Sequence, residues 1–101
     1  MNSPTTLAIV DDMTIYNAEA QKIRLMQALA ESAALALDLT GVNEIDTAGL
    51  QLLLLARREA EATGKDMHIA SLSSAVQELL AFCNLTPFFA GPDVACKDEQ
   101  A

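Results

Sequence analysis

Segments with the period of a β-strand alternate along this chain with segments that have the period of a helix. The strand-like segments are residues 5–12, 34–39 and 67–70, and the helical segments are residues 17–31, 48–63 and 74–83. A strand that is followed by a helix and by another strand of the same sheet forms a right-handed crossover. The order therefore predicts an α/β domain, in which residues 85–89 add a last short strand.

The first two strand-like segments differ in pattern. Apolar residues fall on odd positions from Leu7 to Ile15 and are interrupted at Asp11-Asp12, which predicts a strand from Thr5 to about Asp12 that ends in a bend. Residues 34–39 are apolar apart from Asp38 and lead into a Thr-Gly pair. This second pattern is typical of a buried strand that runs into a turn.

Each helical segment has its own start or stop signals. The first is expected to begin at the N-cap Asn17, and its apolar stripe is formed by Ile23, Met26 and Ala30, flanked by Leu25 and Leu29. The second is a leucine-rich helix from about Ala48 to Thr63, with Gly64 as its C-terminal cap. The third begins with a predicted capping box formed by Ser74 and Gln77.

Composition indicates one domain and restricts its partners. A chain of 101 residues buries one two-layer core, which we assign to residues 5–90, with tails at residues 1–4 and 91–101. The net charge of -8 repels phosphate backbones and anionic membrane surfaces. No apolar run approaches the ~20 residues that cross a bilayer, and no signal peptide is recognisable. We expect a cytoplasmic protein that neither binds nucleic acid directly nor inserts into a membrane.

The residue types that usually hold metals or act as nucleophiles are sparse. Cys83 and Cys96 lie 13 positions apart and fit neither a CxxC redox pair nor a zinc-ligand pattern. The single histidine, His68, is read as an outward-facing residue of the strand at 67–70. We therefore expect no metal site and no cofactor.

Two motifs that are typical of enzymes fail on spacing or context. A strand ending in Asp11-Asp12 resembles the magnesium-binding corner of a phosphoacceptor receiver domain, with Asp38 as a third acid. Between Asp12 and Asp38, however, the sequence predicts one helix, whereas a receiver domain needs a helix, a strand and another helix there. The run at 46–49 is close to the Asp-Thr-Gly turn of dimeric aspartic peptidases, but its glycine comes one place late and opens a leucine-rich helix. We expect no catalytic residues.

Asp46 and Thr47 stand where a polar loop enters the leucine-rich helix. The free N–H groups and the dipole of a helix start favour an anion, so a phosphate on Thr47 would be partly accommodated there. The alternative is structural: Thr47 caps the helix and Gly49 lets the turn pack closely. Spacing alone leaves both interpretations open.

The residues around this position resemble the STAS domain, the fold of bacterial anti-sigma factor antagonists. Residues 45–50, Ile-Asp-Thr-Ala-Gly-Leu, are similar to its Asp-Ser/Thr-x-Gly-Leu signature. Residues 14–19, 37–39 and 74–80 are similar to the entry of its first helix, its central strand and its last helix, in the same order. The resemblance covers roughly residues 5–90 and implies a small mixed sheet of about four strands with three to four helices.

The resemblance also implies a function. The matching hydroxyl, Thr47, would be phosphorylated by a partner serine/threonine kinase of the histidine-kinase-like ATPase type, commonly the anti-sigma factor itself. The partner would dock on Asp46, Thr47, Ala48, Gly49 and Leu50, together with Asp12 and Thr14, and phosphorylation would break the complex. The chain would be a non-enzymatic partner-switching module.

Two departures from the family pattern affect what is implied. The residues before Thr5 are too few for the usual extra edge strand, and Asp11-Asp12 stands where many members have Gly-Glu. Threonine in place of serine also fits two other branches of the fold. One is a small subunit of phospholipid-transporting ABC complexes, and the other is a partner in chemotaxis-like pathways.

Overall fold

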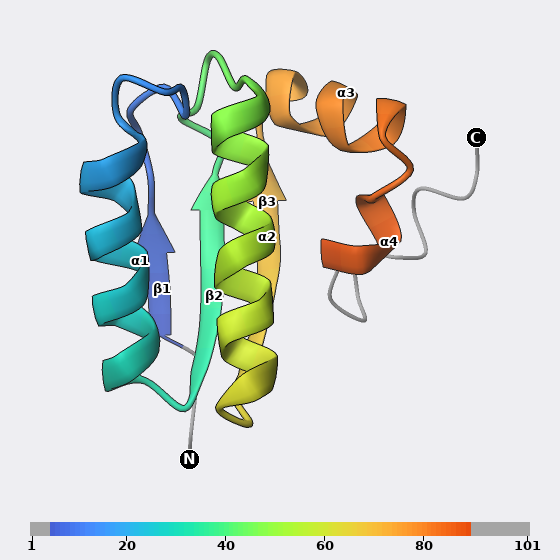
Figure 1. The fold of residues 1–101 in the computed structure, drawn as a ribbon. Coiled ribbons are helices and arrows are strands. Elements are labelled where there is room, and N and C mark those ends of the chain that lie inside the picture. The colour runs from blue at the N-terminus through green and yellow to red at the C-terminus, as the bar shows by residue number, and fades with distance from the viewer. Residues whose placement is uncertain (1–4, 90–101) are drawn as a thin grey trace.

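The computed structural model describes residues 5–89, which form three strands and four helices around one core (Figure 1). In chain order these elements are β1 (Thr5–Ala8), α1 (Ala18–Glu31), β2 (Ala34–Leu39), α2 (Thr47–Ala62), β3 (Asp66–Leu72), α3 (Ser74–Phe82) and α4 (Thr86–Phe89). The predicted α/β class is confirmed. The tails predicted at residues 1–4 and 91–101 lie outside the described residues.

The strands of the described part form one parallel sheet in the order β1-β2-β3. This differs from the expected mixed sheet of about four strands, because the last predicted strand, at residues 85–89, is the short helix α4. Asn84 adopts a left-handed backbone (φ 59°) at the end of α3, which turns the chain. Pro87 then falls in the first turn of α4, where its missing N–H breaks no helical hydrogen bond.

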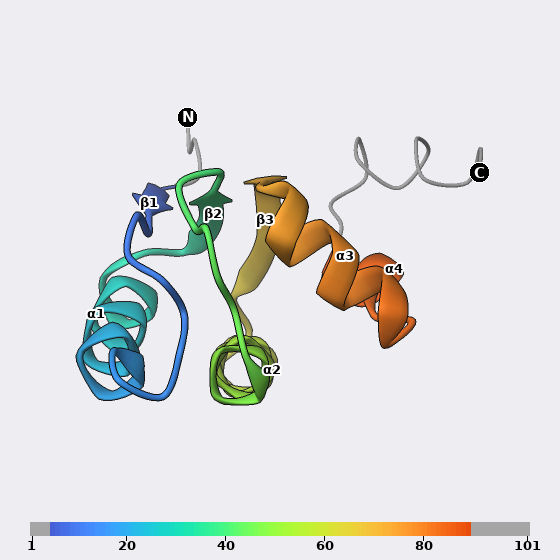
Figure 2. The same cartoon turned by 90° about the horizontal axis from the view of Figure 1, so that it is seen from above.

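Helices α1 and α2 cover the same face of the sheet, and α3 and α4 lie beside its β3 edge (Figure 2). The core between sheet and helices is apolar. Its main members are Leu35, Leu37 and Leu39 of β2, Met67 and Ile69 of β3, Leu25 and Leu29 of α1, and Leu52, Leu53, Ala56 and Ala60 of α2. The leucine-rich segment thus holds α2 firmly on the sheet.

The buried face of α1 differs from the predicted stripe. Gln21, Leu25 and Leu29, spaced by four, face the core, whereas Ile23 is 60% exposed and Ala30 is exposed. The prediction holds for Leu25, Leu29 and the half-buried Met26, and it was wrong for Ile23 and Ala30 because a hydrophobic pattern does not count Gln21. Its Nε2 donates to the carbonyl oxygens of Asp11 and Asp12 at 3.4 and 3.0 Å, which offsets part of the cost of burying this side chain, while its Oε1 has no hydrogen-bond partner within residues 5–89.

Of the two predicted N-caps, one lies at the predicted residue and the other is shifted by one position. Asn17 is the N-cap residue of α1, but its side chain makes no capping hydrogen bond, and its Nδ2 donates to the Asp12 carbonyl. Helix α3 is capped by Ser73, whose Oγ accepts from the N–H of Val76, and Ser74 is the first helical residue. Gly64 follows α2 with a φ of 72°, in the left-handed region that favours glycine, as expected for a helix C-terminus.

Candidate functional site

The loop after β1 and the loop after β2 run together at the carboxyl end of the sheet. Strand β1 ends at Ala8, earlier than the predicted Asp12, but Met13 pairs again with the second loop. Its N–H donates to the Glu44 carbonyl at 2.9 Å, and its own carbonyl accepts from the N–H of Asp46 at 3.1 Å. Because Met13 is fully buried, this pairing fixes both loops against the core.

Asp46 connects this pair of loops to helix α2. Its Oδ1 accepts from the N–H groups of Ala48 (2.9 Å) and Gly49 (3.2 Å), so Asp46 is the N-cap of the helix. Its Oδ2 accepts from the N–H of Ile15 at 3.2 Å, in the loop that leads to α1. One carboxylate therefore fixes the start of α2 relative to the neighbouring loop.

Thr47 is the first residue of α2 and is exposed. Within residues 5–89 its hydroxyl makes no hydrogen bond, and the interpretation that Thr47 caps the helix is wrong, because Asp46 does so. The hydroxyl is thus free on the surface, at the end of a helix whose position is set by the buried leucines.

Gly49 is buried where the first turn of α2 touches the backbone of the β1–α1 loop. A Cβ on Gly49 would lie 2.1 Å from the carbonyl oxygen of Met13 and 2.8 Å from its Cβ. The close packing suggested by the sequence is therefore present, and its cause is the backbone of Met13. Gly49 supports the site from inside the protein, while its neighbours Ala48 and Leu50 are half-buried.

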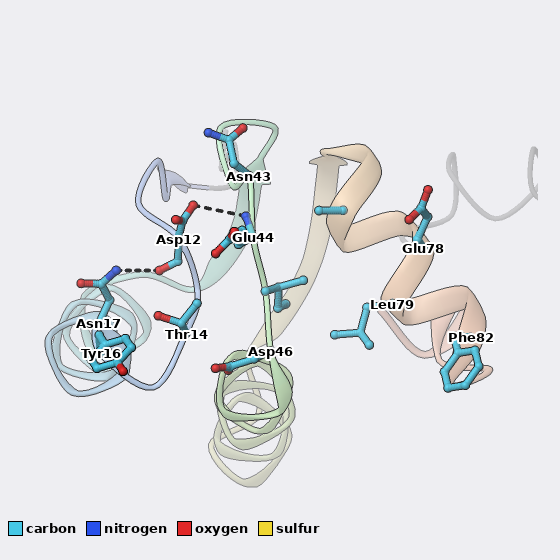
Figure 3. A pocket seen from close by; sticks show the side chains of 12 residues that line it. Asp12, Thr14, Tyr16, Asn17, Asn43, Glu44, Asp46, Glu78, Leu79 and Phe82 are labelled. Atoms are coloured by element: carbon cyan, nitrogen blue, oxygen red, sulfur yellow. Dashed lines mark hydrogen bonds between the residues drawn. The ribbon is translucent and has the colours of Figure 1, made fainter.

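Asp12 and Thr14 lie in the same loop as Met13, and both are half-buried. The Oδ1 of Asp12 accepts from the N–H of Glu44 at 3.2 Å, which adds a further link between the two loops. Asp12, Thr14 and Asp46 line one open groove, whose other wall is α3 (Figure 3). Thr47, Ala48, Gly49 and Leu50 do not line this groove. The structure thus brings together three of the predicted site residues and places Thr47 directly after them.

Sequence reasoning missed the exposed aromatic residues of this groove, Tyr16 and Phe82. For Phe82 a signal was available: Val76 and Leu80, four residues apart, are the buried residues of α3, and Phe82 lies off that face. Tyr16 stands in a turn and belongs to no periodic pattern. Its position could be learned only from the fold.

Other candidate chemistries find no support in the described residues. Residues 5–89 contain no group of three or more histidine, cysteine or acidic side chains arranged to hold a metal ion. In the same part of the chain, no helix has the length and hydropathy needed to cross a membrane. His68 is half-buried on β3, Cys83 is a half-buried free thiol, and Cys96 lies outside the described residues.

Asp38 organises the beginning of the loop that leads to Asp46. Its Oδ1 accepts from the Thr40 hydroxyl (2.7 Å), the Thr40 N–H (3.1 Å) and the Ser71 hydroxyl of β3 (3.0 Å). These hydrogen bonds, with that of the Thr40 hydroxyl strongest, lower the pKa of the Asp38 carboxyl below its ordinary value of 3.8. The folded state therefore favours the ionised form of the Asp38 carboxyl.

This lowered pKa leads to a pH-dependent expectation. The contribution of Asp38 to stability is fully present above pH 3.8 and is lost as the pH falls through its lower folded-state pKa. Asp38→Asn is expected to be less stable than the parent near pH 7, and the difference should shrink in increasingly acidic buffer. Urea unfolding across this range measures it, with Asp11→Asn as a control for the change in net charge. A difference that stays constant with pH would contradict the expectation.

Comparison with known proteins agrees with the resemblance found in the sequence. A family model described as "Mlab, STAS domain" matches residues 2–88. Among solved structures, the fold is similar to that titled "Structure of the Anti-Sigma Factor Antagonist SpoIIAA in its Unphosphorylated Form", with a TM-score of 0.68 and 18% sequence identity. The match covers 99% of this chain and 92% of that chain. At this identity the likeness shows the fold, and the predicted STAS-like fold is confirmed.

Proposed function

Since the chain belongs to the STAS domain family, we propose that it is a partner-switching protein of the anti-sigma factor antagonist type, regulated by phosphorylation of Thr47. The observation that carries the proposal is the exposed, unbonded hydroxyl of Thr47 at the first position of α2. A kinase can reach this hydroxyl, and a partner can read it in a defined position because Asp46 and the buried leucines hold the helix start.

The direction of the switch follows from electrostatics. In the unmodified state the partner docks on the surface around Asp46, Thr47 and Leu50, together with Asp12 and Thr14. A phosphate on Thr47 adds about -1.5 to -2 charges beside the Asp46 carboxylate and competes with it for the same helix N–H groups. Burying this dianion in the interface costs desolvation and like-charge repulsion, so phosphorylation releases the partner.

The proposed partner is an anti-sigma factor that is also a serine/threonine kinase of the histidine-kinase-like ATPase type. In this proposal the complex forms in the cytoplasm. The chain itself is a binding module and a kinase substrate without catalytic activity. The charge of -8 agrees with a protein partner and opposes direct contact with nucleic acid.

Thr47→Ala tests the modification site. The variant is expected to fold with a stability within ~0.5 kcal/mol of the parent, because the lost hydroxyl is exposed and unbonded. It should incorporate no phosphate from the cognate kinase. Ser74→Ala is the matched control, since Ser74 is likewise an exposed hydroxyl at the first position of a helix. Label that persists in Thr47→Ala and disappears in Ser74→Ala would refute the assignment.

Thr47→Glu tests the effect of charge on the interface. Titration calorimetry with the cognate kinase should show clearly weaker binding than for the parent. Thr47→Gln has nearly the same size without the charge and should retain more of the affinity. Equal affinities of all three proteins would mean that the partner does not dock at this helix start.

A second candidate is the accessory subunit of a phospholipid-transporting ABC complex, which the threonine at position 47 and the matching family model also suit. A STAS partner in a chemotaxis-like pathway is a third. Neighbouring genes distinguish them: a permease and ATPase pair favours the transporter, a kinase with a sigma factor favours the switch, and a chemotaxis cluster favours the third. In the transporter role Thr47 would support binding without taking up phosphate.

A further inference from the structure

The groove lined by Asp12, Thr14 and Asp46 has a composition that suits one kind of ligand. It is open, about 910 Å³ in volume, and lies between the two loops at the carboxyl end of the sheet and α3 (Figure 3). Four carboxylates line it, from Asp12, Glu44, Asp46 and Glu78, and no lysine, arginine or histidine does. We call it the acidic groove.

The four carboxylates form two pairs, one with hydrogen-bond partners in the described residues and one without. Asp12 and Asp46 accept backbone N–H groups and hold the loops together. The carboxylates of Glu44 and Glu78, by contrast, make no hydrogen bond or ion pair within residues 5–89. They stand on the loop side and on the α3 side of the groove (Figure 3). Both are available to a cation from outside.

Two exposed aromatic side chains line the same groove. Tyr16, before α1, is 92% exposed, and Phe82, at the end of α3, is 85% exposed. They stand on opposite sides of the groove (Figure 3). Single exposed apolar residues need no explanation, but aromatic rings and carboxylates that line one groove favour a cationic segment with apolar methylene groups, because both the ring face and the carboxylate attract positive charge.

We propose that the acidic groove binds a cationic segment of the partner protein, with arginine or lysine side chains that pair with Glu44 and Glu78 and lie against Tyr16 or Phe82. The size of the groove suits several side chains of a polypeptide better than one small ion. A second copy of this chain is a poor occupant, because its net charge of -8 is repelled. The inference rests on the proposed function in one respect: the partner that carries the cationic segment is the protein that phosphorylation of Thr47 releases.

The groove shares Asp46 and the β1–α1 loop with the switch, but the α3 side of the groove is separate from it. Thr47 does not line the groove, and Glu78 and Phe82 belong to another helix. Contacts of the cationic segment with the α3 side therefore supply affinity that does not depend on the Thr47 hydroxyl. Glu78→Gln should reduce partner binding by the same factor in Thr47→Glu as in the parent, as expected for independent sites.

The first experiment uses the full chain and a synthetic peptide with arginine and leucine at helical spacing, followed by NMR titration. The largest shifts are expected at Glu44, Glu78 and Phe82. Glu78→Gln should weaken binding about two- to fivefold more than Glu59→Gln, the size of one exposed ion pair. Both variants replace an exposed carboxylate, on α3 and on α2 respectively, so general attraction to an acidic protein falls equally in both.

The aromatic part of the groove is tested in the same way. Phe82→Ala should weaken peptide binding about fivefold through the loss of ring contact, whereas Ile23→Ala, on the exposed side of α1, should not change it. Both side chains are exposed, so both variants should fold, which their NMR spectra will show. Equal binding by Glu78→Gln and Glu59→Gln, shifts that map elsewhere, or Phe82-dependent dimers in sedimentation would each overturn the inference.

Binding to the cognate kinase separates this inference from the proposed function. If affinity depends on Thr47 but not on Glu78 or Phe82, the α3 side of the groove is not part of the interface, so the inference fails and the proposed function stands. If Thr47 takes up no phosphate while the arginine peptide still needs Glu78, the proposed function fails and the groove remains a cation-binding surface.

Discussion

Gly49→Ala is expected to lower the free energy of unfolding by about 3 kcal/mol and, in a domain of this size, the Tm by on the order of 15 °C. The new methyl group would lie 2.1 Å from the Met13 carbonyl oxygen, and that oxygen accepts the Asp46 N–H. Relief of the clash must move backbone, because Met13 is fully buried. The movement separates the two loops that form the site. Thermal and urea unfolding measure the loss.

Gly64→Ala is the control, because it replaces a glycine that is needed for a different reason. A Cβ on Gly64 meets nothing within 4 Å, and its cost comes only from the φ of 72°. The loss should be about 1 kcal/mol, and Gly64→Asn should recover part of it because asparagine tolerates this conformation. Gly49→Asn should recover nothing. Similar losses for both alanine variants would contradict the close approach of α2 to Met13.

Asp46→Ala is expected to cost about 2 kcal/mol, because it removes the acceptor of three backbone N–H groups. Two of these groups belong to the first turn of α2, and the third is that of Ile15 in the neighbouring loop. The variant should therefore loosen the helix start and the loop together. Amide hydrogen exchange at Ala48, Gly49 and Ile15, combined with urea unfolding, measures both effects.

Asp46→Asn separates the two roles of this side chain. Its amide has one acceptor oxygen, which can cap α2 as Oδ1 does now, but its nitrogen cannot accept from Ile15. Exchange is therefore expected to accelerate at Ile15 in both variants and at Ala48 and Gly49 only in Asp46→Ala. If Asp46→Ala were as stable as Thr47→Ala, the carboxylate would not be the connection between helix and loop.

These variants bear on the switch because Asp46 adjoins Thr47 in sequence and reaches Ile15 in space. A phosphate that displaces Asp46 from the helix N–H groups also weakens its hold on the loop that carries Tyr16. The proposed modification would thus act on the shape of the docking surface as well as on its charge.

Much of the fold follows from local patterns. The strand–helix alternation predicted the class, Gly64 predicted the end of α2, and the run from Asp46 to Leu50 located the helix start within one residue. The predictions that failed had different causes. Gln21 faces the core because carbonyls of the preceding loop accept hydrogen bonds from its amide, which a hydrophobic pattern does not reveal. The strand expected at residues 85–89 failed for a local reason, because Asn84 turns the chain and Pro87 fits the first turn of α4.

The sequence by itself determined that α2 begins beside Asp46 and Thr47 and is held in the core by its leucines, because helix signals and hydrophobic period act over a few residues. Only the tertiary structure decided that Asp46 is the cap, that Gly49 faces the Met13 carbonyl, and that Glu44 and Glu78 share a groove with Tyr16 and Phe82. Those relations arise where two crossover loops and α3 meet. Their physical cause is the packing of parallel strands, which brings together segments that are more than 30 residues apart in the chain.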